Sequence, residues 1–159
     1  MTARSKDVLG LGLWVAACLG VSALGGWITR TSVADWYQGL VKPSFNPPDG
    51  VFTPVWIALF VLMGVAAWRV WRRGPGPSVR KALALFAVQL CLNLAWSALF
   101  FGVRSIGWAL AEIAVLWIAI MATLRLFHRV DPIAGWLLLP YLAWSTFAVL
   151  LNASLWWLN

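Results

Sequence analysis

The chain has 159 residues, of which 62% are hydrophobic and only 11% are charged, and its mean hydropathy is +0.83. A soluble domain usually carries about 45–50% apolar and about 25% charged residues, so a compact water-soluble fold is excluded. The net charge is +7, and because the basic residues lie in short gaps between apolar runs, they indicate membrane topology rather than nucleic-acid binding.

Five apolar runs are long enough to cross a bilayer, which takes about 20 helical residues. They cover about residues 8–28, 51–71, 82–103, 105–126 and 132–158. Strands of a membrane barrel would be shorter and would alternate in polarity, so the sequence predicts an all-α integral membrane bundle of five transmembrane helices. The whole chain, 1–159, is expected to form a single domain.

The first run is preceded by basic residues, and Val21-Ser22-Ala23 resembles the cleavage site of a signal peptide. The run continues past that site, which favours a retained helix. Small residues recur in it at four-residue spacing, at Gly12, Ala16 and Gly20. Such a stripe allows close helix approach, either within the bundle or at a dimer interface.

Residues 29–50 form the longest connection, TRTSVADWYQGLVKPSFNPPDG, and we call this segment loop 1. It is too long for a simple turn. Its aromatic residues Trp36, Tyr37 and Phe45 need an apolar surface. Either they rest among lipid headgroups, or loop 1 folds over the end of the bundle as a lid, stiffened by its prolines.

Five crossings place the two ends of the chain on opposite sides of the membrane. The side of the N-terminus, with the helix ends that flank it, holds nine basic residues: Arg4, Lys6, Arg69, Arg72, Arg73, Arg80, Lys81, Arg125 and Arg129. The other side holds three, Arg30, Lys42 and Arg104. In a cytoplasmic membrane this asymmetry predicts an inner N-terminus. We call the N-terminal side inner and the side of loop 1 outer.

Polar and aromatic residues gather in the outer halves of three runs. The third run carries a stripe at i, i+4 and i+8 with an indole beside it, and the fifth run carries a second stripe. These residues, with one indole of the second run, are Trp56, Gln89, Asn93, Trp96, Ser97, Tyr141, Trp144, Ala148 and Asn152. Either the amides hold helices together, or the set lines a pocket for a flat ligand, with indoles that stack and amides that orient.

Glu112 is the one acidic residue inside an apolar run. Such a carboxylate is a functional candidate by default, but we expect it to reach the interface or to pair with Arg104. Neither a Ser-His-Asp order nor a phosphate-binding glycine motif occurs, and the single histidine, His128, has no Cys or His near it. The sequence therefore predicts neither a conventional enzyme nor a metal site.

Three separated stretches resemble the TspO/MBR family, which comprises translocator proteins (peripheral benzodiazepine receptors) and tryptophan-rich sensory proteins. They are WYQGLVKPSFNPP (36–48), QLCLNLAWSALFFG (89–102) and PYLAWSTFAVLLNASLWWLN (140–159), in the family's order. Phe45 departs from the tryptophan frequent in the family. No basic residue follows Tyr141, so cholesterol recognition of the animal type is not expected.

The resemblance implies a bacterial-type homodimer of five-helix bundles. It also implies a pocket under loop 1 for porphyrins such as protoporphyrin IX and for benzodiazepine-type drugs, with porphyrin as a ligand and not as an obligatory cofactor. The ligand-binding candidates are Trp36, Tyr37, Asn46, Pro47, Trp56, Gln89, Asn93, Trp96, Tyr141, Trp144, Ala148 and Asn152.

Three functions follow as hypotheses. The first is a receptor or carrier with a sensory or transport role in tetrapyrrole handling and oxidative stress. The second is light- and oxygen-dependent porphyrin degradation, in which Trp56 and Trp144 would supply electrons. The third is a structural or regulatory partner of another membrane protein. The inner orientation applies to a cytoplasmic membrane, and the resemblance also admits an outer membrane.

Overall fold

The computed structural model describes residues 3–159, with side chains from Ser5 onward, so the side chain of Arg4 lies outside the described part. The described chain is helical and contains no strand. Its elements are α1 (Ala3–Val33), the 3₁₀ turn η1 (Tyr37–Gly39), α2 (Asp49–Trp71), α3 (Pro77–Ser97), the π-helical turn η2 (Ala98–Gly102), α4 (Ile106–Val130), α5 (Pro132–Leu137) and α6 (Leu139–Leu158).

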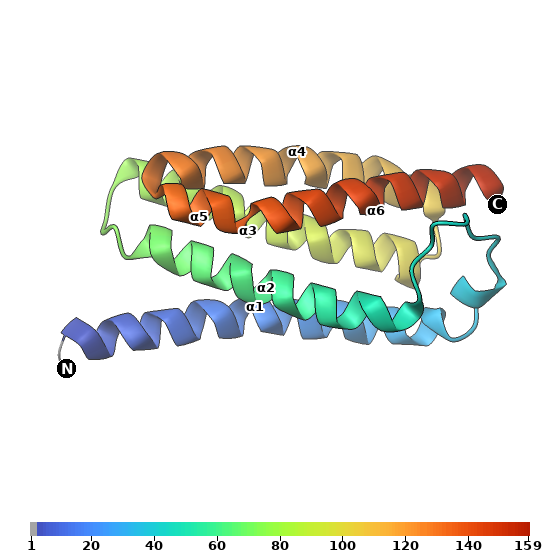
Figure 1. Cartoon of the computed structure of the whole chain (residues 1–159), viewed down its shortest axis with the longest axis horizontal. Helices are drawn as coiled ribbons and strands as arrows, with labels where there is room; N and C mark the ends of the chain where they lie inside the picture. The colour runs from blue at the N-terminus through green and yellow to red at the C-terminus, as the bar shows by residue number, and fades with distance from the viewer. Residues whose placement is uncertain (1–2) are drawn as a thin grey trace.

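Five helical segments are long and apolar enough to cross a membrane, with α3 and η2 forming one segment and α5 and α6 another. Within a bilayer a helix satisfies its own backbone hydrogen bonds, which is why apolar runs of this length adopt it. Figure 1 shows the helices side by side, with the N-terminus at one end of the bundle and loop 1 and the C-terminus at the other. The predicted five-helix membrane bundle is confirmed.

The ends of α1 and α2 differ from the predicted boundaries. The first helix continues to Val33 and α2 begins at Asp49, so only residues 34–48 of loop 1 lie between them. Pro54 lies inside α2, where its missing N–H leaves the carbonyl of Gly50 without the usual i→i+4 bond. An acidic first residue, Asp49, favours the earlier start because it complements the helix dipole.

Two breaks shape the outer and inner halves of the bundle. Below the outer loops, η2 closes i→i+5 hydrogen bonds, such as Val103 N–H to the carbonyl of Ala98 at 2.8 Å. This wider turn was not predicted. The fifth span is interrupted at Leu138, two residues before Pro140, and a proline in a helix is a common cause of such a break.

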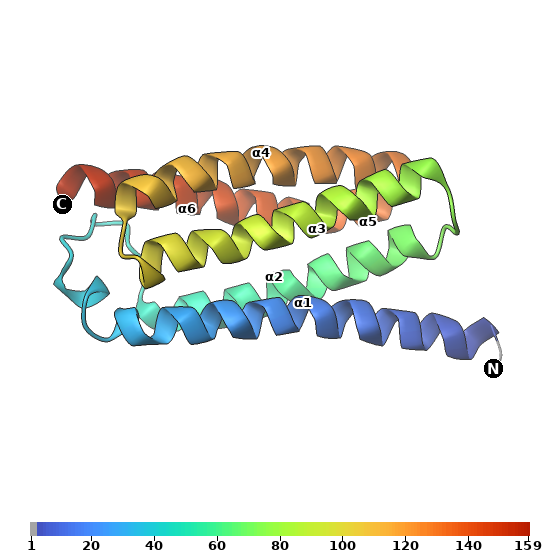
Figure 2. The same ribbon diagram turned by 180° about the vertical axis from the view of Figure 1, so that it is seen from behind.

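The helices surround a space in their outer halves. Around the bundle, α1 packs on α2 and α3, and α4 packs between α3 and α6. The second helix packs on α5 at the inner end but makes few contacts with α6. Figure 2 shows the other side of the bundle, where α1, α3 and α4 lie in front. The sparse contact between α2 and α6 leaves room for a cavity near loop 1.

The inner halves of α1 and α2 approach closely at Gly64. A Cβ atom built on Gly64 would lie 2.6 Å from the Cα atom of Val15, a backbone atom that no side-chain rotation can move away. Small residues next to this contact, Ala66 and Ala67, are fully buried. The close approach of these two helices therefore depends on a glycine.

Replacing Gly64 with alanine is expected to push α1 away from α2 and to lower the free energy of unfolding by about 1–3 kcal/mol. Gly50→Ala is the matched control, because Gly50 lies in the same helix and a Cβ there would meet nothing within 4 Å. Thermal unfolding in detergent should show a lower midpoint for Gly64→Ala only. Equal midpoints for the two variants would contradict the predicted steric conflict.

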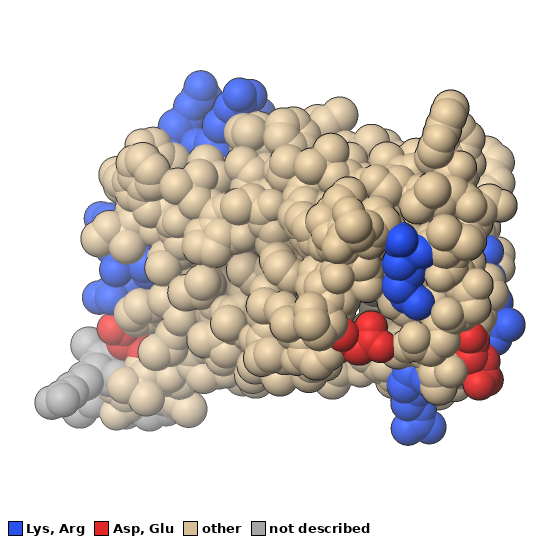
Figure 3. Space-filling model, turned by 45° about the vertical axis from the view of Figure 1, so that its right-hand side comes forward, with Lys and Arg blue, Asp and Glu red and all other residues tan. Residues whose placement is uncertain are grey.

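Charge is concentrated at the ends of the bundle. Figure 3 shows Lys and Arg side chains at the inner end and a smaller mixed group near loop 1, with a wide uncharged band between them. At the inner end Asp131 is 1% exposed and bonds to both Arg69 and Arg73, with a shortest distance of 2.7 Å to Arg73 Nη2. An uncharged band between charged ends is typical of an integral, multi-pass membrane protein.

Candidate functional site

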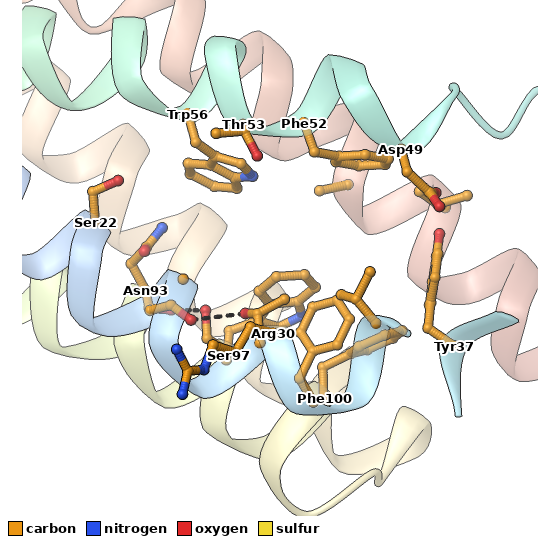
Figure 4. Close-up of a pocket in the computed structure, with 18 of the residues that line it drawn as sticks. Ser22, Arg30, Tyr37, Asp49, Phe52, Thr53, Trp56, Asn93, Ser97 and Phe100 are labelled. Atoms are coloured by element: carbon orange, nitrogen blue, oxygen red, sulfur yellow. Dashed lines mark hydrogen bonds between the residues drawn. The ribbon is translucent and has the colours of Figure 1, made fainter. Parts of the chain in front are cut away.

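A cavity of about 510 Å³ lies in the outer half of the bundle. Residues of α1, loop 1, α2, α3, η2 and α6 line it, and α4 contributes none of the lining residues. Figure 4 shows Trp56, Thr53 and Phe52 on one side of the open space and Asn93, Ser97 and Phe100 on the other. The volume falls within the range of about 300–1,000 Å³ typical of ligand pockets.

Seven of the twelve ligand-binding candidates from the sequence border this cavity: Tyr37, Trp56, Asn93, Trp96, Trp144, Ala148 and Asn152. The other five do not border it: Trp36, Asn46, Pro47, Gln89 and Tyr141. Two of them contact residues that do: Trp36 contacts the ring of Phe100 at 5.5 Å between centroids, and the Tyr141 hydroxyl accepts from Asn93. Their roles toward a ligand stay predictions.

Indole rings form much of the cavity wall, and neighbouring rings hold each of them in place. Trp96 stacks on Phe100 with 5.3 Å between centroids. Trp144 contacts Phe52 at 5.9 Å and Phe147 at 5.4 Å. Side chains fixed in this way present flat apolar faces without having to reorganise when a ligand binds.

Two asparagine amides lie at the same depth as these indoles. Asn93 Nδ2 donates to the hydroxyl of Tyr141 at 3.0 Å. Asn152 Oδ1 accepts from Trp96 Nε1 at 3.1 Å, while its Nδ2 donates to the carbonyl of Ile106 at 3.0 Å. Both amides therefore connect helices and border the cavity at once, and their role toward a flat ligand stays a prediction.

Gln89 differs from the two asparagines because it does not border the cavity. It lies one turn deeper on α3, where its Nε2 contacts the sulfur of Met63 at 3.9 Å. Its carbonyl oxygen is buried without a hydrogen-bond partner in the described chain. The structure thus places Gln89 in the core between α2 and α3.

Residues 34–48 of loop 1 cover the outer end of the cavity and contribute Ala34, Tyr37 and Gln38 to its lining. The phenol of Tyr37 donates to Asn46 Oδ1 at 2.9 Å, and Gln38 Nε2 donates to Asp49 Oδ2 at 2.7 Å. Burial and the nearby Asp49 carboxylate raise the pKa of Tyr37, although the bond to Asn46 opposes this shift. Tyr37 therefore stays protonated and keeps its donor role at neutral pH.

Several lining residues were missed by sequence reasoning. They are aromatic side chains of α2, η2 and α6 together with a small-residue face of α1: Phe52, Phe100, Phe101, Phe147, Ser22, Gly25, Gly26 and Thr29. A phenylalanine in an apolar run carries no signal that separates a lipid contact from a cavity wall. The α1 face did carry one, since its small residues recur at helical spacing.

The expectation for Glu112 is wrong. Arg104 Nε donates to Ser32 Oγ at 3.3 Å, and among the described residues Arg104 forms no ion pair with Glu112. Both carboxyl oxygens of Glu112 are buried without a hydrogen-bond partner in that part of the chain, so the side chain does not reach the interface.

The small-residue stripe of α1 faces away from the rest of the bundle. Gly12, Ala16 and Gly20 are all exposed, and a Cβ on either glycine would meet nothing within 4 Å. The stripe therefore does not serve packing inside one chain. A role at a dimer interface stays a prediction.

The chain is similar to known membrane proteins over nearly its whole length. The family model described as TspO/MBR family matches residues 14–158. The tryptophan-rich protein TspO of Chlorobaculum tepidum is 43% identical over 159 residues, covering 98% of this chain and 99% of that protein. The translocator protein of Sus scrofa is 40% identical, covering 86% and 84%. The tryptophan-rich sensory protein of Cereibacter sphaeroides is 41% identical, covering 87% and 84%.

Proposed function

We propose that this chain, which belongs to the TspO/MBR family, is a membrane receptor or carrier that binds porphyrins in the cavity beneath loop 1. One observation carries the proposal: three indoles and two hydrogen-bonded amides border one cavity in the outer half of the bundle. The names of two relatives, a sensory protein and a translocator protein, are consistent with sensing or moving such a ligand.

A flat, largely apolar macrocycle suits this cavity better than a compact polar metabolite. Trp56, Trp96 and Trp144 provide faces on which a conjugated ring can stack. Asn93 and Asn152 provide polar groups that can orient pyrrole nitrogens or substituents. Benzodiazepine-type drugs share the planar aromatic chemistry, and we propose that they compete for the same space.

Binding of protoporphyrin IX tests the proposal, and Ala148→Phe is its sharpest variant. Ala148 borders the cavity from α6, so a phenyl ring there would occupy ligand space while removing no existing contact of the amides or indoles. We expect saturable quenching of tryptophan fluorescence in the wild type and at least about tenfold weaker binding in Ala148→Phe.

Ala143→Phe is the control, because Ala143 lies exposed on the same helix and does not border the cavity. It should bind protoporphyrin IX like the wild type. Quenching that never saturates in the wild type would contradict the proposed function, and equal affinity in both phenylalanine variants would place the ligand elsewhere.

We also propose a homodimer and a cytoplasmic-side N-terminus for a chain in the cell membrane. The exposed stripe of Gly12, Ala16 and Gly20 supports close approach of a second α1. The excess of basic residues at the inner end supports the orientation.

A further inference from the structure

Asn159, which follows α6, forms three hydrogen bonds through its side-chain amide. Its Oδ1 accepts from the backbone N–H of Val41 at 2.9 Å, and its Nδ2 donates to the backbone carbonyl of Val41 at 3.1 Å. The same Nδ2 donates to the carbonyl of Leu155 at 2.9 Å. Val41 belongs to loop 1 and lies 118 positions away in the sequence.

The chemistry of the amide explains why an asparagine fits here. A carboxamide carries a donor and an acceptor in one plane, so it pairs with both the N–H and the C=O of a single residue, as a neighbouring strand would. The bond to Leu155 uses one of the last carbonyls of α6, which lack partners inside the helix. The side chain is therefore held on α6 while it pairs with loop 1.

Both segments that this contact joins, α6 and loop 1, also line the cavity nearby. Leu155 borders the cavity from α6, and Tyr37 and Gln38 border it from loop 1, shortly before Val41. In the described chain, the other side-chain hydrogen bonds of residues 34–48 stay within this segment or reach Asp49 at the start of α2. Asn159 thus supplies the polar connection from loop 1 to α6, beside the ring contact of Phe45 with Phe147.

We infer that Asn159 is a positioning residue that holds loop 1 closed over the cavity, and that opening this contact sets how fast a ligand enters and leaves. The inference rests on the proposed function of the cavity. The contact is exposed to solvent, so its bonds are individually weak and the closed loop can open. Losing such a contact should change the rates of ligand association and dissociation without preventing the bundle from folding.

The experiment compares Asn159→Ala and Asn159→Asp with the wild-type full chain in lipid nanodiscs. Hydrogen exchange at the Val41 amide reports the contact, and stopped-flow fluorescence with protoporphyrin IX reports association and dissociation. In Asn159→Ala we expect faster Val41 exchange and a rise of roughly three- to tenfold in both rates. Asn159→Asp keeps an acceptor for the Val41 N–H but loses both donated bonds, so its exchange and rates should be intermediate.

Trp157→Ala is the matched control, because Trp157 lies in the same last turn and is 83% exposed. It should leave Val41 exchange and both rates unchanged, and all variants should keep the thermal midpoint of the wild type. Unchanged Val41 exchange in Asn159→Ala would overturn the inference that Asn159 holds loop 1 closed. Faster exchange with unchanged rates would show that Asn159 holds loop 1 but does not set the rates of ligand binding. A wild type without saturable binding would overturn the proposed function, and with it this role of Asn159.

Discussion

Replacing Asp131 with asparagine is expected to lower the free energy of unfolding by about 2–4 kcal/mol. The carboxylate is 1% exposed and accepts from Arg69 Nε at 3.2 Å and from Arg73 Nη2 at 2.7 Å. It also caps α5, because its Oδ1 accepts from the Ala134 N–H at 3.1 Å. An asparagine retains the cap oxygen but leaves the two guanidinium groups without their anion, and their partial exposure keeps the loss below that of a fully buried pair.

Acid should remove the same stabilisation in the wild type. Burial alone would raise the pKa of Asp131, but hydrogen bonds from Arg73, Arg69 and the Ala134 N–H outweigh it and hold that pKa below its ordinary value. A lowered folded-state pKa contributes stability that is present above the unfolded-state pKa, about 3.9, and is lost as the pH falls through the folded-state pKa.

Unfolding in mild detergent, followed by circular dichroism between neutral pH and pH of about 3, measures both effects. The wild type should lose stability below a pH of about 4, and Asp131→Asn should be less stable at neutral pH and show a smaller loss on acidification. Asp7→Asn is the control. Both side chains of the Asp7–Arg72 pair are exposed and the charged atoms lie 3.5 Å apart, so losing this pair should change stability little. An Asp131→Asn protein as stable as the wild type at neutral pH would contradict the role of this cluster.

The sequence was most informative where one physical demand dominates. Twenty apolar residues in a row have few alternatives to a membrane helix, which is why five spans could be predicted. Helical periodicity likewise placed Asn93 and Asn152 on inward stripes, and both border the cavity. The start of α5 was also predictable, because Asp131 followed by Pro132 is a favourable first turn.

The sequence was less informative where contacts between helices decide the local structure. Proline is best tolerated in the first turn of a helix, so the local pattern around Pro54 favours a start beside it and could not choose Asp49 as the first residue of α2. The π-helical turn that holds Phe100 and Phe101 depends on packing between α3, α1 and α4. The surroundings of Glu112 depend on how α4 is rotated about its axis, because a shift of one residue turns a side chain from the lipid-facing side to the protein interior.

Trp144→Ala is expected to weaken protoporphyrin IX binding by about 2–4 kcal/mol, roughly 30- to 1,000-fold in Kd, if the proposed cavity is the binding site. The indole borders the cavity and is held between Phe52 and Phe147. Its removal takes away both the stacking face and the apolar area that a macrocycle would cover. Trp144→Phe keeps a smaller ring in the same place and should lose less affinity.

Trp136→Ala separates the loss of a binding surface from the loss of a fluorophore. Trp136 is 62% exposed on α5 at the inner end, far along the bundle from loop 1, and does not border the cavity. Both alanine variants remove one of 13 tryptophans, so both reduce the starting fluorescence, but only Trp144→Ala should shift the midpoint of the titration. Because the midpoint depends on affinity and not on signal amplitude, equal midpoints would show that the porphyrin binds outside the cavity, for example in the surrounding lipid or detergent.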